Sequence, residues 1–180
     1  TYNLDAPHKG GRILGEILNL FVEYANQQDK KLLNNTKVKL VTFGRKQSFK
    51  IKISQIEWYH LSEINGDEKL NALYRAADIF LSPSTGCNAP STIRESTINS
   101  IPTIAFDNGE ASETIKNNVN GFLIPKYDNK KFATAIFDTL FNKNFLVDKN
   151  WNELLKLRYS SKTEAEMIIN KASRDFKNEK

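Results

Sequence analysis

Residues 78–107, DIFLSPSTGCNAPSTIRESTINSIPTIAFD, decide the fold of this 180-residue chain. Two short apolar runs, at 78–82 and 102–106, are typical of buried strands. Between them, a Pro-Ser pair at 90–91 marks the start of a helix that we expect to end at residue 99. A strand, a polar loop, a helix and a second strand make up a βαβ unit, in which the two strands are parallel.

Short strands and helices alternate through the rest of the chain as well. Apolar residues at helical spacing predict helices at 12–25, 68–77, 111–117 and 129–142, followed by one or two further helices from residue 146. Short β-rich runs predict strands at 38–43 and 121–124, and residues 56–61 are a further candidate. This order predicts an α/β fold with a Rossmann-like parallel sheet and helices on both faces. Ligands of such sheets bind at the carboxyl ends of the strands.

The composition agrees with one soluble domain. Apolar residues make up 39% and charged residues 26% of the chain, and a length of 180 residues is enough for a substantial core. No apolar run reaches the roughly 18 residues that a membrane-spanning helix needs. We therefore expect a single domain over 1–180, with 145–180 as a C-terminal helical extension. Because the chain begins without Met, we expect it to be part of a longer protein.

Charge and cysteine content give further expectations. A single cysteine, Cys87, cannot form an internal disulfide, which favours the reducing cytoplasm. The net charge of +5 is compatible with binding phosphate or an anionic membrane surface. A solvated, lysine-rich surface is the other interpretation of this charge. No motif combines basic with aromatic residues, so we do not expect a nucleic-acid partner.

The loop at 83–90 feeds the start of a helix at a carboxyl strand end. The first backbone N–H groups of a helix lack intrahelical partners, and the helix dipole favours an anion there, such as a diphosphate. Glu95 lies one turn into the helix, where a carboxylate can accept hydrogen bonds from two ribose hydroxyls. Alternatively, Glu95 only caps the helix or complements its dipole, and the residues alone leave both interpretations open.

An ordered series of motifs resembles a known family. The segments EKLNALYRAADIFLSPS, NAPSTIRES, IPTIAFDNGEASETI and NVNGFLIP follow one another as in the C-terminal, nucleotide-sugar-binding domain of the family-4 (group 1) glycosyltransferases. HKGGRILGEIL is similar to the Lys-Gly segment that opens the first helix of that domain. The resemblance covers roughly residues 1–143 and implies one half of a two-domain GT-B fold. The N-terminal, acceptor-binding domain would then be absent from this chain.

The resemblance implies two catalytic residues. Lys9 matches the lysine that pairs with the donor diphosphate, and Glu95 matches the second glutamate of an E-x7-E pattern, which binds the ribose. The first acidic residue of that pattern is replaced by Cys87, whose thiol is a poor, uncharged acceptor. Contact with the sugar would therefore move to Asn88 or to the backbone, the donor preference would differ, or activity would be weakened. No histidine lies near Cys87 in sequence to make it a nucleophile.

Further residues are expected to line the donor site. They are Gly44, Arg45, Ser84, Cys87, Asn88, Ala89, Pro90, Ser91 and Thr92. Gly44 gives the backbone room to turn after a strand, and Arg45 faces either the nucleotide or solvent. Glu113 either meets a sugar hydroxyl or caps its helix, and we favour capping. The arginine that the family places before the lysine segment has no match here and would lie upstream of Thr1.

The implied reaction is transfer of a sugar, with retention, from a UDP- or GDP-sugar to a glycan or lipid-linked acceptor in bacterial surface polysaccharide synthesis. We expect no cofactor and no metal, because no Asp-x-Asp pair or His/Asp cluster occurs and fixed positive groups can stabilise the leaving diphosphate. The expected partners are the nucleotide sugar and the N-terminal domain of the full-length chain. Peripheral contact with the inner face of the membrane stays open. The isolated domain should bind donor weakly and transfer nothing efficiently.

Three other functions compete with this interpretation. One is a nucleotide-binding Rossmann module without catalysis, which Cys87 makes more plausible. Another is one half of a nucleotide-sugar epimerase that shares the two-domain architecture. A dehydrogenase is disfavoured, because no Gly-x-Gly-x-x-Gly motif follows a predicted strand.

Overall fold

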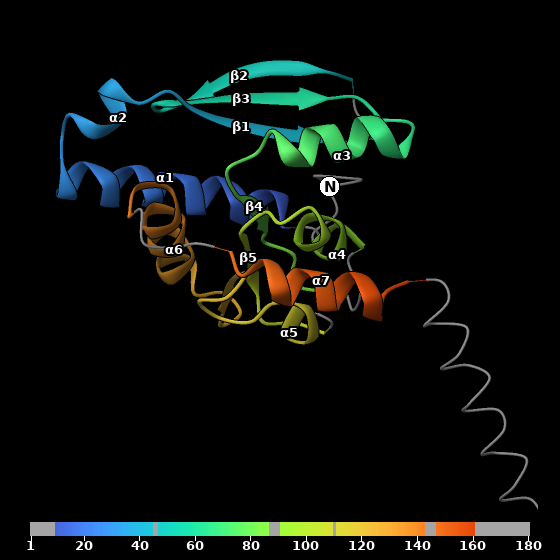
Figure 1. The fold of residues 1–180 in the computed structure, drawn as a ribbon. Helices are drawn as coiled ribbons and strands as arrows, with labels where there is room; N and C mark the ends of the chain where they lie inside the picture. The colour runs from blue at the N-terminus through green and yellow to red at the C-terminus, as the bar shows by residue number, and fades with distance from the viewer. Residues whose placement is uncertain (1–9, 45–46, 87–90, 110, 143–146, 161–180) are drawn as a thin grey trace, which may run out of the picture.

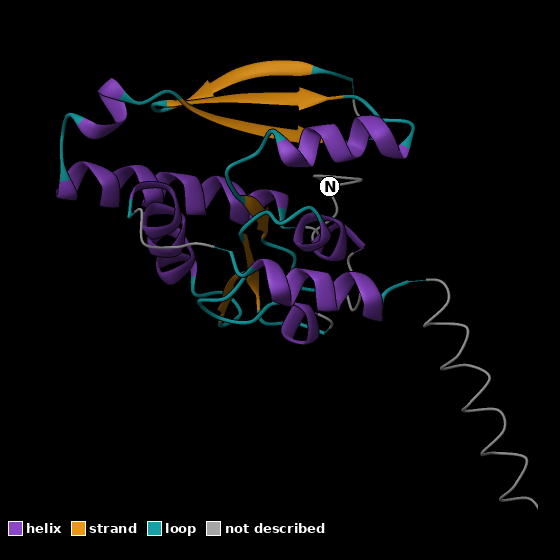
Figure 2. Ribbon diagram, in the orientation of Figure 1, coloured by secondary structure: helices purple, strands orange, loops and turns teal. Residues whose placement is uncertain are grey.

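The computed structural model describes residues 10–44, 47–86, 91–109, 111–142 and 147–160. Strands and helices alternate from residue 56 to residue 141, and Figures 1 and 2 show the elements of the whole fold. The helices are α1 (Gly11–Gln28), α2 (Leu32–Asn35), α3 (Asp67–Arg75), α4 (Ser91–Ile98), α5 (Ala111–Thr114), α6 (Asn129–Phe141) and α7 (Lys149–Arg158). The strands are β1 (Val38–Phe43), β2 (Phe49–Ile53), β3 (Ile56–Leu61), β4 (Phe80–Ser82), β5 (Thr103–Phe106) and β6 (Gly121–Ile124).

The strands form two three-stranded sheets. One has the order β4-β5-β6 and is parallel throughout, which confirms the βαβ unit predicted from residues 78–107. The other has the order β1-β3-β2, with β1 parallel and β2 antiparallel to β3. The sequence left residues 49–53 unassigned. They pair with β3 through a two-residue turn in which Ser54 has a φ of 52°, and so short a connection permits only an antiparallel hairpin.

Helices cover both faces of the parallel sheet, as predicted. The central strand β5 is buried along its whole length. Ile104 and Phe106 belong to the main core with residues of α1 and α6, whereas Ala105 packs with Ile93 of α4 and Ile115 after α5. Alternate side chains of a strand point to opposite faces, so the two clusters lie on opposite sides of the sheet.

The main core explains the longest helices. The buried residues of α1 recur at helical spacing and form one stripe: Leu14, Ile17, Leu18, Phe21, Val22 and Ala25. This stripe packs against α6, which lies beside α1 in Figure 1. The start of α6 is fixed by Asp128, whose carboxylate accepts a hydrogen bond from the backbone N–H of Lys131 at 3.0 Å. Asp128 is thus the N-cap of the helix predicted at 129–142.

Small polar residues seat α4 on β5. Ser96 and Thr97 are both 0% exposed. The Ser96 hydroxyl hydrogen-bonds the Thr103 hydroxyl at 2.8 Å and donates to the carbonyl of Ile93 at 2.9 Å. With its polar atoms satisfied, this face of the helix can lie close to the strand. The contact fixes the rotation of α4 and therefore the direction in which Glu95 points.

The Asn-Gly pair at 120–121 shortens α5 and starts β6. The Asn120 side chain accepts a hydrogen bond from the Lys116 N–H at 2.8 Å and donates to the carbonyl of Thr114 at 3.0 Å. These bonds take backbone groups that would otherwise continue the helix, so α5 ends at Thr114 instead of the predicted residue 117. A Cβ atom at Gly121 would lie 1.9 Å from the Thr103 carbonyl oxygen, so only glycine fits there.

Candidate functional site

The start of α1 meets the loop that follows β4. Gly10, the N-cap of α1, has a φ of 76°, and a Cβ atom added to it would lie 2.1 Å from the carbonyl oxygen of Pro83. Glycine is thus required both by the backbone conformation and by the close approach. The contact brings an N-terminal helix end to the carboxyl end of a parallel strand. The predicted residues Lys9, Arg45 and Cys87–Pro90 lie outside the described residues.

The second helix end at this edge is that of α4. Ser91 and Thr92 form its first turn, with Ser91 exposed and Thr92 half-buried. The helix begins at Ser91, as predicted, and follows the loop after β4 directly. The first backbone N–H groups of a helix favour a negatively charged group, so the start of α4 suits an anion in solvent contact.

Glu95 is held by a side chain from another helix. The hydroxyl of Tyr74, on α3, donates to Oε2 of Glu95 at 2.8 Å. Tyr74 is only 3% exposed. Burial, together with the charge of Glu95 and this hydrogen bond, raises the pKa of Tyr74 well above its usual value, so the hydroxyl keeps its proton. Glu95 therefore joins α3 to α4 and is oriented by a fixed donor.

The Tyr74 ring links the ends of two strands. It meets the ring of Phe43 edge-on at 6.5 Å and that of Phe80 at 5.6 Å between centroids. Phe43 ends β1, and Gly44 follows with its N–H donating to the carbonyl of Leu61 at 3.2 Å. Tyr74 falls within the helix predicted at 68–77, and sequence reasoning gave its side chain no role. The available signal was its hydroxyl, since a buried tyrosine usually finds a hydrogen-bond partner.

Ser84 and Asn108 connect the carboxyl ends of β4 and β5. Ser84 is 5% exposed and Asn108 is 7% exposed. The Nδ2 of Asn108 donates a short hydrogen bond to the carbonyl of Ser84. Ser84, predicted from the sequence as a substrate-binding residue, thus uses its carbonyl within the protein. Asn108 was not singled out, and nothing in the residue pattern pointed to it.

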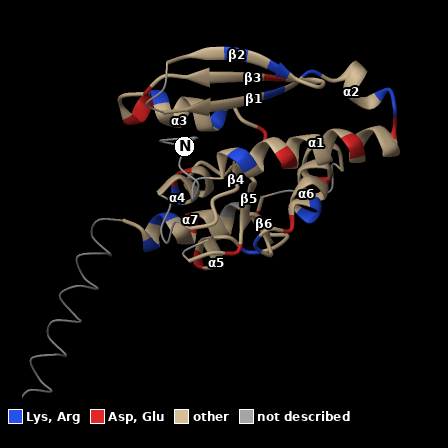
Figure 3. Ribbon diagram, turned by 180° about the vertical axis from the view of Figure 1, so that it is seen from behind, with Lys and Arg blue, Asp and Glu red and all other residues tan. Residues whose placement is uncertain are grey.

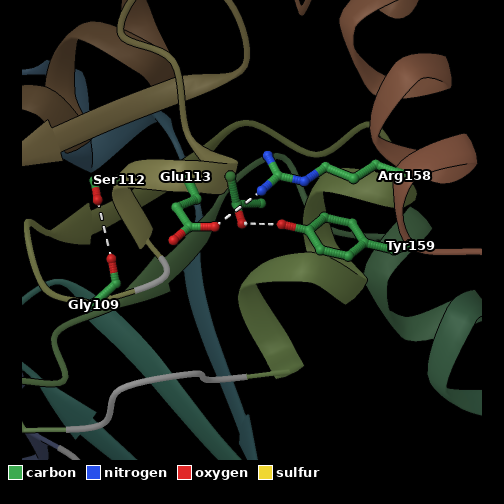
Figure 4. Close-up of polar contacts among 6 residues, drawn as sticks. Gly109, Ser112, Glu113, Arg158 and Tyr159 are labelled. Atoms are coloured by element: carbon green, nitrogen blue, oxygen red, sulfur yellow. Dashed lines mark hydrogen bonds and ion pairs between the residues drawn. The ribbon is translucent and has the colours of Figure 1, made fainter. Parts of the chain in front are cut away.

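Glu113 was expected to meet a sugar hydroxyl or to cap its helix, and in the structure it forms an ion pair. Its Oε2 lies 3.0 Å from Nη2 of Arg158, at the end of α7. Next to it, the Thr114 and Tyr159 hydroxyls hydrogen-bond at 3.1 Å, and Figure 4 shows the two contacts side by side. The Glu113 side chain thus ties α5 to α7 in an ion pair. α7 lies within the expected C-terminal helical extension, and the extent of that extension stays a prediction.

Charged side chains are spread over the part of the chain that the structure describes. Lys and Arg are distributed over several elements in Figure 3 and form no single stripe there. Within the same part of the chain, no three His, Cys, Asp or Glu side chains are grouped so as to hold a metal ion. Nor does any described helix combine the length and apolar character that crossing a membrane requires.

The candidate site residues that the structure describes thus lie at one edge, at the carboxyl ends of the strands. Helix starts favour an anion, Glu95 offers an oriented acceptor, and Asn108 and Tyr74 hold the surrounding segments. Residues 11–142 match the family described as glycosyl transferases group 1. The chain belongs to the group 1 glycosyltransferases. The match confirms the resemblance stated from the sequence motifs.

Solved structures show the same fold. Sucrose-phosphate synthase from Thermosynechococcus elongatus has a TM-score of 0.71 and 17% identity, over 98% of this chain and 44% of that one. Anabaena Alr3699/HepE in complex with UDP has a TM-score of 0.60 and 21% identity, over 96% and 47%. The pneumococcal O-GlcNAc transferase GtfA, in complex with UDP and GlcNAc, has a TM-score of 0.59 and 17% identity, over 88% and 32%.

These glycosyltransferases are longer than the chain described here. The chain spans 44% of the synthase and 47% of HepE, about half of each. This agrees with one half of a GT-B fold. A comparison with curated proteins gave no significant match.

Proposed function

We propose that this group 1 glycosyltransferase domain binds a nucleoside diphosphate sugar at the edge built by the starts of α1 and α4 and the ends of β1, β4 and β5. The observation that carries the proposal is the approach of Gly10 to Pro83. It brings the segment that follows Lys9 in sequence against the strand end that leads to α4. HepE in complex with UDP-glucose and GtfA in complex with UDP support a uridine nucleotide as the first donor to test.

The proposed chemistry is transfer with retention of configuration. Lys9 and the first N–H groups of α4 hold the diphosphate and stabilise the charge that develops on it as the sugar leaves. Glu95 accepts hydrogen bonds from the ribose hydroxyls, with Tyr74 fixing one of its oxygens. These positive groups take the place of a metal ion. Arg45, Cys87 and Asn88 contact the donor from the neighbouring loops.

The proposal extends to the role of the full-length protein. A second domain of the full-length protein binds the acceptor, a glycan or lipid-linked sugar of bacterial surface polysaccharide, in the cytoplasm at the inner face of the membrane. Because the acceptor site is then elsewhere, the 180-residue chain binds donor but transfers nothing efficiently.

Calorimetry and thermal-shift measurements of the chain with UDP, GDP and their glucose and mannose conjugates, in EDTA, test the proposal. A ligand at 100 times its Kd raises the free energy of unfolding by about 2.7 kcal/mol. Lys9→Ala should weaken binding at least tenfold, whereas Lys130→Ala, an exposed lysine at the start of α6, should leave it unchanged. Absence of binding by every nucleotide at several millimolar would contradict the proposal.

A nucleotide-binding module without catalysis is the second candidate. It is favoured by Cys87, which stands where the family resemblance places an acidic residue. Turnover of a nucleotide sugar by the full-length protein decides between them. Sugar transfer by that protein supports the enzyme, and tight donor binding without turnover supports the module.

A further inference from the structure

Asn108 has a buried acceptor without a partner. The residue is the second after the end of β5 and is 7% exposed. Its Nδ2 is used by the carbonyl of Ser84, but its Oδ1 is buried and has no hydrogen-bond partner among the described residues. Leaving a buried amide oxygen unpaired is unfavourable. Such a group calls for a reason beyond packing.

Asn120 is a buried asparagine of the same fold whose amide has partners at both ends. It is fully buried, and both ends of its amide are satisfied by the backbone of Lys116 and Thr114. Asn152 of α7 is also buried with unpaired amide atoms. Only Asn108, of these three, follows the carboxyl end of a parallel strand. That edge is where open α/β sheets bind their ligands.

The neighbours of Asn108 belong to the candidate donor site. Ser84, whose carbonyl it holds, follows Pro83, and Pro83 meets Gly10 at the start of α1. Gly109, the next residue in the chain, has a φ of 44° and turns the backbone away after the strand. Asn108 therefore lies in the loop after β5 and contacts the loop after β4.

The chemistry of the Asn108 Oδ1 atom limits which ligand groups can bind to it. An amide oxygen only accepts hydrogen bonds, so it needs an O–H or N–H donor. Ionised phosphate oxygens also only accept, and they do not suit it. A nucleoside diphosphate sugar carries suitable donors in the hydroxyls of its ribose and of its sugar.

We propose that Asn108 is a donor-binding residue of this domain. Its Nδ2 fixes the loop after β4 through Ser84, while its Oδ1 accepts a hydrogen bond from a hydroxyl of the nucleoside diphosphate sugar. The proposal rests on the proposed function, since it names a further contact of the same site. It adds a side chain that the family resemblance did not supply.

The test compares Asn108→Leu with the matched variant Asn120→Leu in the 180-residue chain. Both replace a buried asparagine with leucine, but Asn120 precedes β6 and lies at the amino end of the sheet. Calorimetry with UDP-glucose and with UDP measures the affinity, and thermal unfolding without ligand measures the stability. GDP-mannose and GDP replace them if only guanosine nucleotides bind the unmodified chain.

We expect Asn108→Leu to bind the nucleotide sugar at least tenfold more weakly, and Asn120→Leu to bind it normally despite a lower Tm. A loss confined to the nucleotide sugar assigns the contact to the sugar. An equal loss with the free diphosphate assigns it to the ribose. A lower Tm with unchanged affinity in Asn108→Leu means that Asn108 is only a structural latch and overturns the inference.

A second measurement covers the case in which Asn108→Leu does not fold. In the unmodified chain, the side-chain amide resonances of Asn108 should shift when UDP-glucose or GDP-mannose is added, and those of Asn120 should not. Binding without a shift at Asn108 overturns the inference while leaving the proposed function standing. Failure of the unmodified chain to bind any nucleotide overturns both.

Discussion

Glu95 and Tyr74 show how a hydrogen bond within the fold can orient a carboxylate that is also proposed to bind a ligand. The buried hydroxyl needs an acceptor, and the carboxylate provides it at 2.8 Å. A carboxylate has room for several more hydrogen bonds, so the same group can still receive ribose hydroxyls. Structural and binding roles of Glu95 are thus compatible, and substitutions can separate them.

Glu95→Gln should weaken nucleotide binding while the domain stays folded. The amide oxygen can still accept from Tyr74, but the charged acceptor for ribose is lost, and hydrogen bonds to charged groups contribute about 1.5–3 kcal/mol. Calorimetry with UDP should show an affinity loss of about tenfold or more. Unchanged affinity together with a much lower Tm would mean that Glu95 only supports the fold.

Tyr74→Phe should change the response of stability to alkaline pH. The pKa of Tyr74 is raised in the folded state above the usual value of about 10, because the residue is buried beside Glu95. The folded state therefore keeps a proton that the unfolded state loses, and the free energy of unfolding should fall by up to about 1.4 kcal/mol per pH unit above pH 10. Below pH 10 this contribution is fully present.

Urea unfolding between pH 8 and pH 11 measures this effect. Tyr74→Phe keeps the ring contacts with Phe43 and Phe80 and removes the titrating group. The variant should therefore show a shallower loss of stability above pH 10 than the unmodified chain. Parallel curves for the two proteins would show that Tyr74 ionises as readily in the folded state as in the unfolded state.

At the scale of elements, the N-cap glycine of α1 and a glycine inside the helix have opposite roles. Gly10 is at a positive φ against Pro83, whereas a Cβ atom at Gly15 would meet nothing within 4 Å. Gly15→Ala should raise the free energy of unfolding by up to about 1 kcal/mol, because alanine is the better helix former. Gly10→Ala should lower it and weaken UDP binding, because α1 must shift away from the loop after β4.

Thermal unfolding and calorimetry of the two variants check this pair. Because Gly10 caps the helix that contains Gly15, a general effect of alanine on α1 would change both variants alike. If Gly10→Ala is as stable as Gly15→Ala and binds UDP normally, the approach of α1 to Pro83 is not part of the site.

The attachment of α7 should depend on its apolar side and little on its ion pair. Arg158 and Glu113 are exposed, with side-chain exposures of 48% and 60%, and such pairs contribute less than about 1 kcal/mol. Leu155 is buried, so Leu155→Ala should cost about 2–5 kcal/mol. Urea unfolding of Arg158→Ala and Leu155→Ala compares the two. A larger loss for Arg158→Ala would show that the ion pair holds the helix.

Elements with a strong period were predictable from the sequence, and long-range contacts were not. The stripe on α1 and the apolar runs of β5 and β6 declare their structure locally. β2 was missed, because its lysines alternate with apolar residues next to a second run and the register depends on the turn at Ser54. β4 is shorter than predicted and begins at Phe80, where pairing with β5 begins.

The same limit applied to the site. The family resemblance proposed Glu95 and the end of a predicted strand proposed Gly44. Tyr74 and Asn108, in contrast, owe their positions to partners 21 and 24 residues away in the chain. Such pairs arise only when the sheet has formed and neighbouring strand ends meet. Composition and periodicity carry no information about which distant side chains will share a hydrogen bond.

At the scale of the whole molecule, the burial of β5 on both faces predicts that its backbone is among the last to be exposed when the domain unfolds. Its amides pair with β4 on one side and β6 on the other, so they are exposed to solvent only when the sheet comes apart. Their hydrogen exchange should be the slowest in the chain and should report global unfolding. The amides of the edge strand β2 should exchange much faster.

Donor binding should therefore slow the hydrogen exchange of β5, even at amides that the donor does not touch. If exchange of β5 occurs only from the unfolded state, a nucleotide at 100 times its Kd should slow it about 100-fold, the full factor by which the ligand disfavours unfolding. Exchange of β2 through local opening should change little. Mass spectrometry of the exchanged chain with and without UDP would reveal whether the site and the centre of the sheet open as one unit.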